Sequence, residues 1–403
     1  MQETLLPENQ DQFAELARFC LSEKKSLAIS GNNSKSGFGY SVQADIDASM
    51  SACTGIIEYD PAELVMRARA GTTLNEIKTV LTEQQQQLAF EPETMSALYS
   101  NSREDTIAGV FASNLSGSRR FQAGSARDHL LGFNAINGRA ELYKSGGNVI
   151  KNVTGYDLSK LICGSWGTLS VLTELSFKVL PAPAVIVTAI LDDLNTEKAL
   201  GLLSTLATSP LHASGLALLP GGIKSALESN VTQANCTSLI RFEGSRTSVD
   251  ARLREFQTSY ASQMSVSLLE QDESLQIWKA LSSASPVAYH PVIMKLSIPP
   301  SLALRMSQLL NEIGNCNWYL DAAGAWFWLG LETTKAVENI NRFRSSLAEE
   351  NGSAILYKAP DEIKNKVGIY SPAQVTLESL RLRIKESFDP ANIFNPGRLD
   401  YQK

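Results

Sequence analysis

Three glycine-rich segments, each next to a short apolar run, constrain the fold of this chain more than any other feature. They are GNNSKSG (residues 31–37), TIAGVFASNLSGSRRFQAG (residues 106–124) and GSWGTLSV (residues 164–171). Glycine lets a backbone approach a ligand where a Cβ would collide, although any one such segment is equally typical of a plain turn. Because chance turns would not require all three, the pattern favours backbone lying against an extended anionic ligand with flat rings.

The first of these segments, GNNSKSG, follows the short apolar run LAIS at residues 27–30. Consecutive backbone N–H groups in such a turn form a cationic concavity, to which Ser34 can add a hydroxyl and Lys35 an exposed countercharge. The spacing matches neither the phosphate loop GxxxxGK[ST] nor the dinucleotide motif GxGxxG. The segment indicates either an anion-binding loop of another kind or an exposed polar turn.

Length and composition exclude several classes of protein. At 403 residues the chain is too long for one compact core, so two domains are expected. The net charge of -6 argues against nucleic-acid binding, which needs a basic surface. Without an apolar run of roughly 20 residues or a signal-like start, the sequence predicts a soluble cytoplasmic protein. The five cysteines are far apart and the three histidines lack metal-ligand spacing, so reduced thiols and no metal site are expected.

The pattern changes after Pro183. The elements predicted there run strand, helix, strand, strand, helix, and the same order starts again at Val292. This is the ferredoxin-like pattern, and two such units can share one antiparallel sheet. The region therefore predicts an antiparallel-sheet domain that is distinct from the glycine-rich part.

The end of the chain has a helical segment, LESLRLRIKESF, and then the turn-rich DPANIFNPGRL. Ile393 and Phe394 are expected to anchor this tail on the main body. We therefore expect an α+β chain with a first domain of residues 1–182, a cap domain of residues 183–365 and a tail of residues 366–403 that returns to the first domain.

Eight motifs occur in an order that resembles the FAD-binding subunits of bacterial glycolate oxidases. They are GNNSK, RAGTTLNEI, LAFEP, TIAGVFASNLSGSRR, GSARDHLLG, KNVTGYDLSKL, GSWGTLSVLTELSFKVLP and FDPANIFNPGR. Those subunits belong to the vanillyl-alcohol oxidase, or PCMH-type, flavoproteins. The resemblance implies a PCMH-type FAD-binding domain, a ferredoxin-like antiparallel-sheet cap and non-covalent FAD. The pair KNVTGYDL and GSxGTLxVLTE is specific to the 2-hydroxyacid branch.

The resemblance also implies which residues bind the cofactor. The first loop is expected to wrap the FAD pyrophosphate, the stretch from Thr106 to pass along the flavin, and the GxxGTL turn to lie against the cofactor. The residues implied in this way are Gly31, Asn32, Asn33, Ser34, Lys35, Thr106, Ile107, Ala108, Gly109, Ser113, Asn114, Gly124, Arg127, Gly164, Gly167, Thr168, Leu169 and Val171.

The sequence departs from the family pattern at a few positions. Ala108 stands where the family has the second glycine of a TIGG motif, and Asn32-Asn33 stands where many relatives have further glycines. We expect the loop to depend on asparagines in the left-handed region. The histidines that carry covalent flavin in some relatives have no counterpart, and His129 is expected to be an ordinary packed or exposed residue.

By resemblance, the chain is a subunit that supports the oxidation of glycolate to glyoxylate, together with a catalytic flavoprotein subunit and an iron–sulfur subunit. Electrons would pass through flavin and partner clusters, and contact with the inner membrane would be peripheral, through the complex. Two alternatives remain: a self-sufficient FAD-dependent 2-hydroxyacid dehydrogenase, of the kind that acts on D-lactate, and a non-catalytic scaffold with the flavoprotein fold.

The cap carries no clear catalytic motif, and the sequence assigns no catalytic residue. The HxGDGNxH-like metal motif of catalytic relatives is missing, and His212 and His290 are far apart. Several cap residues can bind a substrate carboxylate, and the alternative is that they are ordinary solvated side chains. They are Arg241, Lys279, Lys295, Tyr319 and Lys358. The strand WFWLGL (residues 326–331) is interpreted either as a buried aromatic strand or as part of a pocket or partner surface.

Overall fold

The computed structural model describes residues 4–92, 94–147, 156–192, 194–221, 236–314, 316–372 and 375–399. Two compact units make up the chain. The first comprises residues 1–116, 124–182 and 372–403, and the second comprises residues 117–123 and 183–371. Residues 151–155 of the KNVTGYDL motif lie outside the described residues. Residues 183–371 form the main part of the second unit, which thus includes residues 366–371 as well as residues 117–123.

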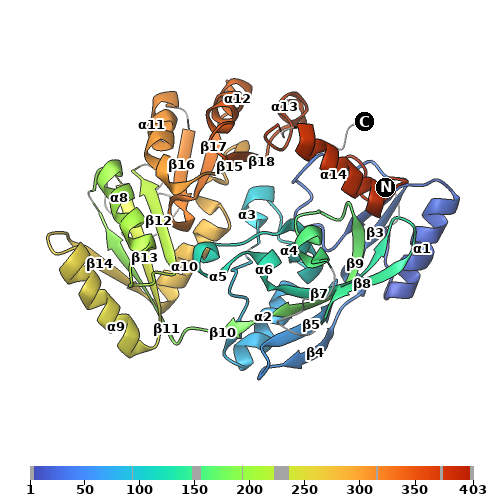
Figure 1. Ribbon diagram of the computed structural model, residues 1–403, viewed down its shortest axis with the longest axis horizontal. Helices are drawn as coiled ribbons and strands as arrows, with labels where there is room; N and C mark the ends of the chain where they lie inside the picture. Colours follow the sequence, from blue (N-terminus) through green and yellow to red (C-terminus); the bar gives the residue numbers. More distant parts are fainter. Residues whose placement is uncertain are drawn as a thin grey trace. The chain divides into compact units, whose positions relative to one another are not determined.

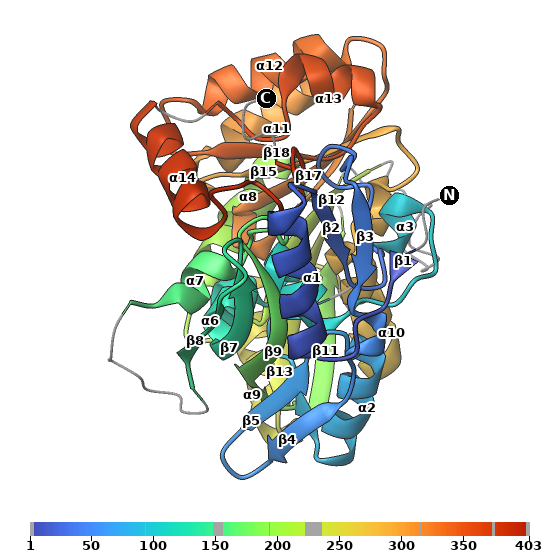
Figure 2. The same ribbon diagram turned by 90° about the vertical axis from the view of Figure 1, so that its right-hand side faces the viewer.

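Two sheets and a two-stranded ribbon form the first unit (Figure 2). A parallel sheet has the order β1 (Thr4–Leu5), β3 (Ile46–Ser49), β2 (Leu27–Ser30). An antiparallel sheet has the order β4 (Ile56–Asp60), β5 (Val65–Arg69), β9 (Ser170–Lys178), β7 (Leu130–Asn137), β8 (Leu142–Gly146). The ribbon pairs β10 (Leu180–Pro181) with β6 (Gln86–Gln87).

The helices of the first unit are mostly short. They are α1 (Gln10–Ser22), α2 (Leu74–Glu83), α3 (Ser96–Tyr99), α4 (Ile107–Ser113), α6 (Ala126–His129), α7 (Leu158–Ile162) and α14 (Val375–Phe388). The side chains of Asn9 and Thr73 cap α1 and α2 by accepting backbone N–H bonds, which satisfies donors that have no partner inside a helix. Phe13 of α1 and Ile77 of α2 are buried in one core with Phe177 of β9.

The tail joins the edge of the parallel sheet. The N–H of Leu27 donates to the carbonyl of Ile393 (2.7 Å), and the N–H of Asn395 donates to the carbonyl of Leu27 (3.0 Å). Phe394 is fully buried in the core of the first unit. Residues at the end of the chain are therefore part of the same unit as the first glycine-rich loop.

One antiparallel sheet of eight strands forms the second unit, in the order β14-β11-β13-β12-β16-β17-β15-β18 (Figure 1). The first half contains β11 (Val185–Leu191), α8 (Thr196–Ala207), β12 (Gly215–Pro220), β13 (Cys236–Gly244), α9 (Arg246–Glu255) and β14 (Val266–Glu270). The second half contains β15 (Val292–Ser297), α11 (Ala303–Ile313), β16 (Cys316–Asp321), β17 (Trp326–Leu331), α12 (Ala336–Leu347) and β18 (Ser353–Lys358).

Each half has the ferredoxin-like order βαββαβ, and the halves meet where Leu218 of β12 pairs with Leu320 of β16. The prediction of two such units in a single sheet is confirmed. The sequence did not indicate β14, an edge strand with mostly exposed side chains. The elements α5 (Arg120–Ala123), α10 (Gln271–Ser282) and α13 (Asp361–Val367) complete this unit.

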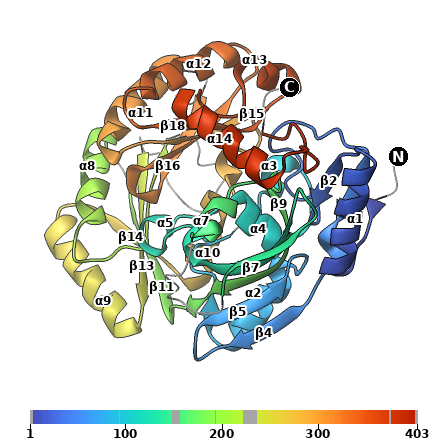
Figure 3. The same ribbon diagram turned by 45° about the vertical axis from the view of Figure 1, so that its right-hand side comes forward.

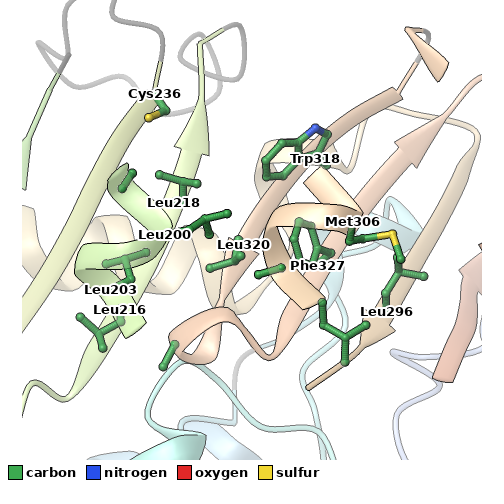
Figure 4. Packing of buried hydrophobic residues seen from close by; sticks show 14 of the residues in the cluster. Leu200, Leu203, Leu216, Leu218, Cys236, Leu296, Met306, Trp318, Leu320 and Phe327 are labelled. Carbon is green, nitrogen blue, oxygen red and sulfur yellow. The ribbon is translucent and has the colours of Figure 1, made fainter. Parts of the chain in front are cut away.

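The two faces of this sheet have different covers. Helices α8, α9, α11 and α12 bury one face in a continuous apolar core, and Figure 3 shows them along that face of the sheet. Figure 4 shows this core, where Leu203 of α8 and Leu218 of β12 lie on one side and Phe327 of β17 on the other. Since side chains alternate along a strand, every second residue faces away from these helices. Helix α10 packs on that other face, where a Cβ on Gly215 would lie 2.7 Å from the ring of Trp278.

Candidate functional site

A pocket of about 100 Å³, partly open to solvent, lies within the first unit. We call it the loop pocket. Its walls come from residues 29–36, from α4, from residues 166–172 and from Arg398 in the tail. Of the residues implied by the resemblance, those that line it are Gly31, Asn32, Asn33, Ser34, Lys35, Thr106, Ala108, Gly109 and Gly167. Parts of all three glycine-rich segments therefore meet at one place.

The loop after β2 packs tightly against the start of α4. A Cβ on Gly31 would lie 2.2 Å from the hydroxyl oxygen of Thr106, so only glycine fits at this position. Asn33 adopts the left-handed conformation that we expected of the loop asparagines (φ 60°), whereas Asn32 does not. Within the described residues, no acceptor takes the backbone N–H groups of Asn32, Asn33 and Ser34. Neighbouring N–H groups of this kind form a site for an anion.

Lys35 is not the exposed countercharge that the sequence suggested. Its ammonium group lies 2.5 Å from a carboxylate oxygen of Asp105, and the two side chains are only 7% and 1% exposed. The Ser34 hydroxyl donates to the same oxygen. Burial lowers the pKa of Lys35, and the charge of Asp105 partly offsets that effect. The side chains of Ser34 and Lys35 therefore fix the loop to Asp105, a residue that the sequence analysis missed.

Helix α4 presents one face to the loop pocket. The Thr106 side chain caps its first turn by accepting from the N–H of Gly109 (3.3 Å). Ala108, Gly109 and Ala112 line the pocket. The other predicted residues on this segment do not line it. Ile107 is buried in the core, the Ser113 hydroxyl donates to the Gly109 carbonyl (2.7 Å), and the Asn114 side chain accepts from the N–H of Arg127.

The turn between α7 and β9 reaches the pocket through Gly167, which was expected, and through residues that were not. Trp166 (φ 53°) lines the pocket and stacks on Phe38, with ring centroids 3.8 Å apart. Ser170 and Leu172 of β9 line the pocket, and Leu172 is also part of the core. Val171 of the same strand and Leu169 just before it are buried in the core and do not line the pocket. Because side chains alternate on a strand, a shift of one position along the sequence exchanges the residues on one face of the strand for those on the other.

The remaining implied residues lie away from the loop pocket. The Thr168 hydroxyl donates to the Ser165 carbonyl (2.7 Å) and is fully buried. Gly124 and Gly164 have positive φ values (84° and 89°), which suits their turns. Arg127 is about half exposed. The structure therefore gives these glycines a role in turns, and it does not bring Thr168 or Arg127 to the pocket.

In the second unit, a buried charge network lies on the sheet face opposite helices α8, α9, α11 and α12. Arg119 binds Glu243 through two hydrogen bonds (2.9 and 2.5 Å), and Arg241 lies 3.6 Å from the same carboxylate. Although burial alone would raise the pKa of Glu243, the two arginines lower it to about 2. Arg241 also donates to the Ser214 hydroxyl and stacks over Trp278. Arg241 is therefore a buried structural cation.

Lys295 lies on the same face, among aromatic rings. Its ammonium group is 3.6 Å from the ring centroid of Trp326, 5.2 Å from that of Trp328 and 5.8 Å from that of Tyr357. In the described part of the chain no hydrogen-bond acceptor contacts this group, although the residue is only 8% exposed. Burial, reinforced by Arg120, lowers the pKa of Lys295 to about 7. Lys295 is thus a buried amine that titrates near neutral pH.

The other candidates for binding a substrate carboxylate are either exposed or bonded to backbone carbonyls. Lys279 is exposed, Lys358 donates to the Ala288 carbonyl (3.0 Å), and the Tyr319 hydroxyl donates to the Leu281 carbonyl (2.6 Å). All six residues of the strand WFWLGL are buried, so its interpretation as a buried aromatic strand holds and these side chains are not exposed for a partner.

His129 is buried, and His290 contacts Glu332 (2.9 Å). Across the described ranges, no group of three or more His, Cys, Asp or Glu residues is placed to hold a metal ion. Nor is any described helix both long and apolar enough to cross a membrane.

Comparisons with protein families and curated proteins place these features in context. A family model for an FAD binding domain matches residues 2–146, and one for the C-terminal domain of FAD linked oxidases matches residues 370–399. Glycolate oxidase subunit GlcE of Escherichia coli (strain K12) is 31% identical over 384 residues, which cover 94% of each chain. Glycolate oxidase subunit GlcD of Bacillus subtilis (strain 168) is 22% identical over 98% of this chain and 88% of its own.

Solved structures show the same fold at low sequence identity. A p-cresol methylhydroxylase with substrate bound superposes with a TM-score of 0.69 at 13% identity, over 98% of this chain and 88% of the other. The 4-ethylphenol oxidase of Gulosibacter chungangensis gives a TM-score of 0.71 at 11% identity with the same coverage. The PCMH-type architecture expected from the sequence is therefore confirmed.

Proposed function

The chain belongs to the family of FAD-linked oxidases that contains the glycolate oxidase subunits, and from this premise we propose that it is the FAD-binding subunit of a glycolate oxidase complex. FAD is its cofactor, and the proposal is that the loop pocket holds it non-covalently. The observation that carries this placement is the set of three backbone N–H groups for which the described residues offer no acceptor, next to Gly31, where an added Cβ would lie 2.2 Å from the Thr106 hydroxyl oxygen. These residues fit a pyrophosphate group.

The residues of the chain have separate tasks in this proposal. The N–H groups of Asn32, Asn33 and Ser34 bind the pyrophosphate, and Asp105 positions their loop through Ser34 and Lys35. Ala108 and Gly109 keep the α4 wall flat because they present little or no side chain. When bound, FAD supplies the hydride acceptor for oxidation of a 2-hydroxyacid. The substrate we propose is glycolate, and the product is glyoxylate.

We further propose that the chain works with a catalytic flavoprotein subunit and an iron–sulfur subunit. The relatives GlcE and GlcD are both named as subunits, which supports an assembly of several chains. The sequence has no CxxCxxC run, so the clusters that pass electrons onward would lie in a partner. A place in the cytoplasm, with peripheral contact to the inner membrane through that complex, is part of this proposal.

The cofactor placement is tested with the purified chain and Gly31→Val. Acid precipitation of the wild type is expected to release FAD into the supernatant. Gly31→Val is expected to abolish flavin binding, because its side chain collides with Thr106 and the β-branch disfavours the turn. Normal flavin content in Gly31→Val would place the cofactor elsewhere, and a wild type that takes up no FAD would favour the scaffold alternative.

Partner dependence needs a separate experiment. Dye reduction with glycolate is expected to be slow for the chain alone and to rise when the catalytic and iron–sulfur subunits are added, with all chains co-eluting. Equal rates with and without partners would instead support a self-sufficient 2-hydroxyacid dehydrogenase.

One observation favours that second candidate. Lys295 is a buried amine without a described acceptor and with a pKa near neutrality, which are properties of a group that takes a proton or binds a carboxylate. Under this alternative, Lys295→Met would abolish dye reduction by the isolated chain without reducing its FAD content.

A further inference from the structure

We propose that Asn395, in the C-terminal tail, is a positioning residue of the cofactor site. Its side-chain amide joins the strand before the first glycine-rich loop to the turn at Trp166 and Gly167. Asn395 was not among the residues implied by the family resemblance. The inference rests on the proposed function, because it takes the loop pocket as the place where FAD binds. It adds that the shape of this pocket depends on the tail.

The tail extends the parallel sheet of the first unit. Phe394 forms a parallel bridge with Leu27 of β2, and the N–H of Asn395 donates to the carbonyl of Leu27 (3.0 Å). At the next step along β2, the side chain of Asn395 takes the place of a backbone. Its oxygen accepts from the N–H of Ile29 (2.7 Å), and its amide nitrogen donates to the Ile29 carbonyl (3.2 Å). The tail thus fixes the part of β2 that leads directly into Gly31.

The same amide nitrogen also bonds to the turn that supplies another wall of the pocket. It donates to the carbonyls of Trp166 and Gly167, each at 3.2 Å. The N–H of Trp166 in turn donates to the carbonyl of Ala112 in α4 (2.9 Å). Because Ile29, Trp166 and Ala112 all line the loop pocket, one amide connects its β2 wall to a turn that is itself bonded to α4.

Gly167 is the position that lets the amide come so close to the turn. Its φ is 71°, and a Cβ there would lie 2.7 Å from Nδ2 of Asn395. In the described part of the chain, no other residue beyond the chain neighbours of Gly167 has an atom within 4 Å of that Cβ position. A side chain here would therefore displace the amide from the carbonyls it bonds. Besides lining the pocket, this glycine makes room for the tail.

The protein itself holds Asn395 in place. The residue is only 2% exposed, and its backbone is left-handed (φ 42°), a conformation that asparagine adopts more readily than most residues. Directly after α14, the Asp389 side chain accepts from the N–H groups of Ile393 (3.0 Å) and Phe394 (2.9 Å). Walls that are joined by a preorganised group lose little conformational freedom when a ligand binds, which strengthens binding.

The first experiment titrates full-length apoproteins with FAD and follows flavin fluorescence. Asn395→Ala is expected to weaken FAD binding about ten- to hundredfold, because several hydrogen bonds that hold the walls are lost. The matched control is Asn392→Ala in the same tail. Asn392 is also left-handed (φ 51°) but exposed, and among the described residues its side chain has no hydrogen-bond partner. Both variants place alanine in the left-handed region, so Asn392→Ala should bind FAD like the wild type.

The second experiment separates positioning from a general loss of stability by combining Asn395→Ala with Gly167→Ala. Alone, Gly167→Ala pushes the amide away and should weaken FAD binding. Once Asn395→Ala has removed the amide, the same change should weaken binding about tenfold less. Gly164→Ala is the control, because Gly164 also has a positive φ (89°) but its nearest neighbour is 3.8 Å away. Its effect should be the same in both backgrounds.

The apoproteins give a readout that needs no cofactor. The Trp166 ring stacks on Phe38 with centroids 3.8 Å apart, so this pair contributes to the near-ultraviolet circular dichroism. The part of the spectrum that Trp166→Phe removes should be smaller in the Asn395→Ala background than in the wild type. In the Asn392→Ala background it should be unchanged.

Several results would contradict the positioning role. Wild-type FAD affinity in Asn395→Ala is one, and equal effects of Gly167→Ala in both backgrounds is another. Should Asn395→Ala not fold, Asn395→Asp replaces it, since an ionised carboxylate keeps the acceptor for Ile29 but offers no donor to the turn. Wild-type FAD affinity in that variant would also overturn the proposal. A wild type that binds no FAD would overturn the proposed function, and this inference with it.

Discussion

At the scale of single residues, several charged side chains of this chain are buried. Where such charges are paired, removing one member leaves the other buried and uncompensated. Removing one member is therefore expected to destabilise the fold more than removing both. Lys35 with Asp105 in the first unit and Arg119 with Glu243 in the second are the clearest cases. Lys295 differs because aromatic rings, not an acceptor, surround its ammonium group.

Lys35 and Asp105 are expected to be strongly coupled. Lys35→Met leaves the Asp105 carboxylate buried and uncompensated, so the free energy of unfolding should fall by about 3 kcal/mol. The double variant Lys35→Met/Asp105→Asn should recover much of that loss, since the charge is then removed. Urea unfolding of the wild type, Lys35→Met, Asp105→Asn and the double variant measures the coupling. Additive losses in the double variant would show that the pair does not interact energetically.

Lys295 predicts a pH-dependent stability. Its pKa is lowered from 10.5 to about 7, so between these values the unfolded chain binds more protons than the folded one. Below pH 7, burying this charged amine lowers the free energy of unfolding by its full cost. That cost disappears as the pH rises towards 10.5. Relative to Lys295→Met, the wild type should gain about 2 kcal/mol of stability between pH 7 and pH 9.

The control for this measurement is Lys279→Met, which removes an exposed lysine of the same unit. Its stability difference from the wild type should not change over the same pH range. If the Lys295→Met difference is also flat with pH, the buried amine does not have the lowered pKa.

At the scale of elements, the two faces of the eight-stranded sheet are specified by side-chain alternation and by a few close contacts. The bulge between Ile293 and Met294 shifts the pairing of β15 with β18. Tyr357 is the residue of β18 that the strand pairing skips at this shift, and its ring centroid lies 5.8 Å from the Lys295 ammonium group. Bulges commonly redirect a side chain towards a functional group. The aromatic surroundings of Lys295 thus depend on an irregularity of the sheet.

The packing of α10 on β12 depends on Gly215. A Cβ there would lie 2.7 Å from the Trp278 ring, which is held by a hydrogen bond to Thr188 (2.8 Å) and cannot easily move. Gly215→Ala should therefore destabilise the protein by about 1–3 kcal/mol. The matched control is Gly201→Ala in α8, where no atom lies within 4 Å and a helix-favouring residue should stabilise slightly. Equal melting temperatures for the two variants would contradict this packing argument.

At the scale of the whole molecule, the fold persists where sequence identity has almost vanished. The solved structures that share it are only 11% and 13% identical, at TM-scores of 0.71 and 0.69. Such folds are maintained by the pattern of buried and exposed positions, which many different sequences satisfy. The specific chemistry of this chain therefore has to be sought in individual groups such as Asp105, Arg398 and Lys295.

The sequence by itself determined the architecture and the segments that surround the loop pocket. The three glycine-rich segments together indicated a backbone that lies close to a ligand, and the repeated order of strands and helices indicated the double ferredoxin-like sheet. Both signals are local in the chain, or repeat at a regular interval. Such signals can be recognised without knowing which distant residues become neighbours in the fold.

Only the tertiary structure decided which side chains face the pocket and where the charges are compensated. On β9, Ser170 and Leu172 line it and Val171 does not, because the pairing with β7 sets the register of this part of the strand. Lys35 meets Asp105, 70 residues along the chain, and Arg398 meets the loop across 363 residues. Contacts between residues so far apart leave no periodicity or local motif in the sequence, since they exist only once the chain has folded.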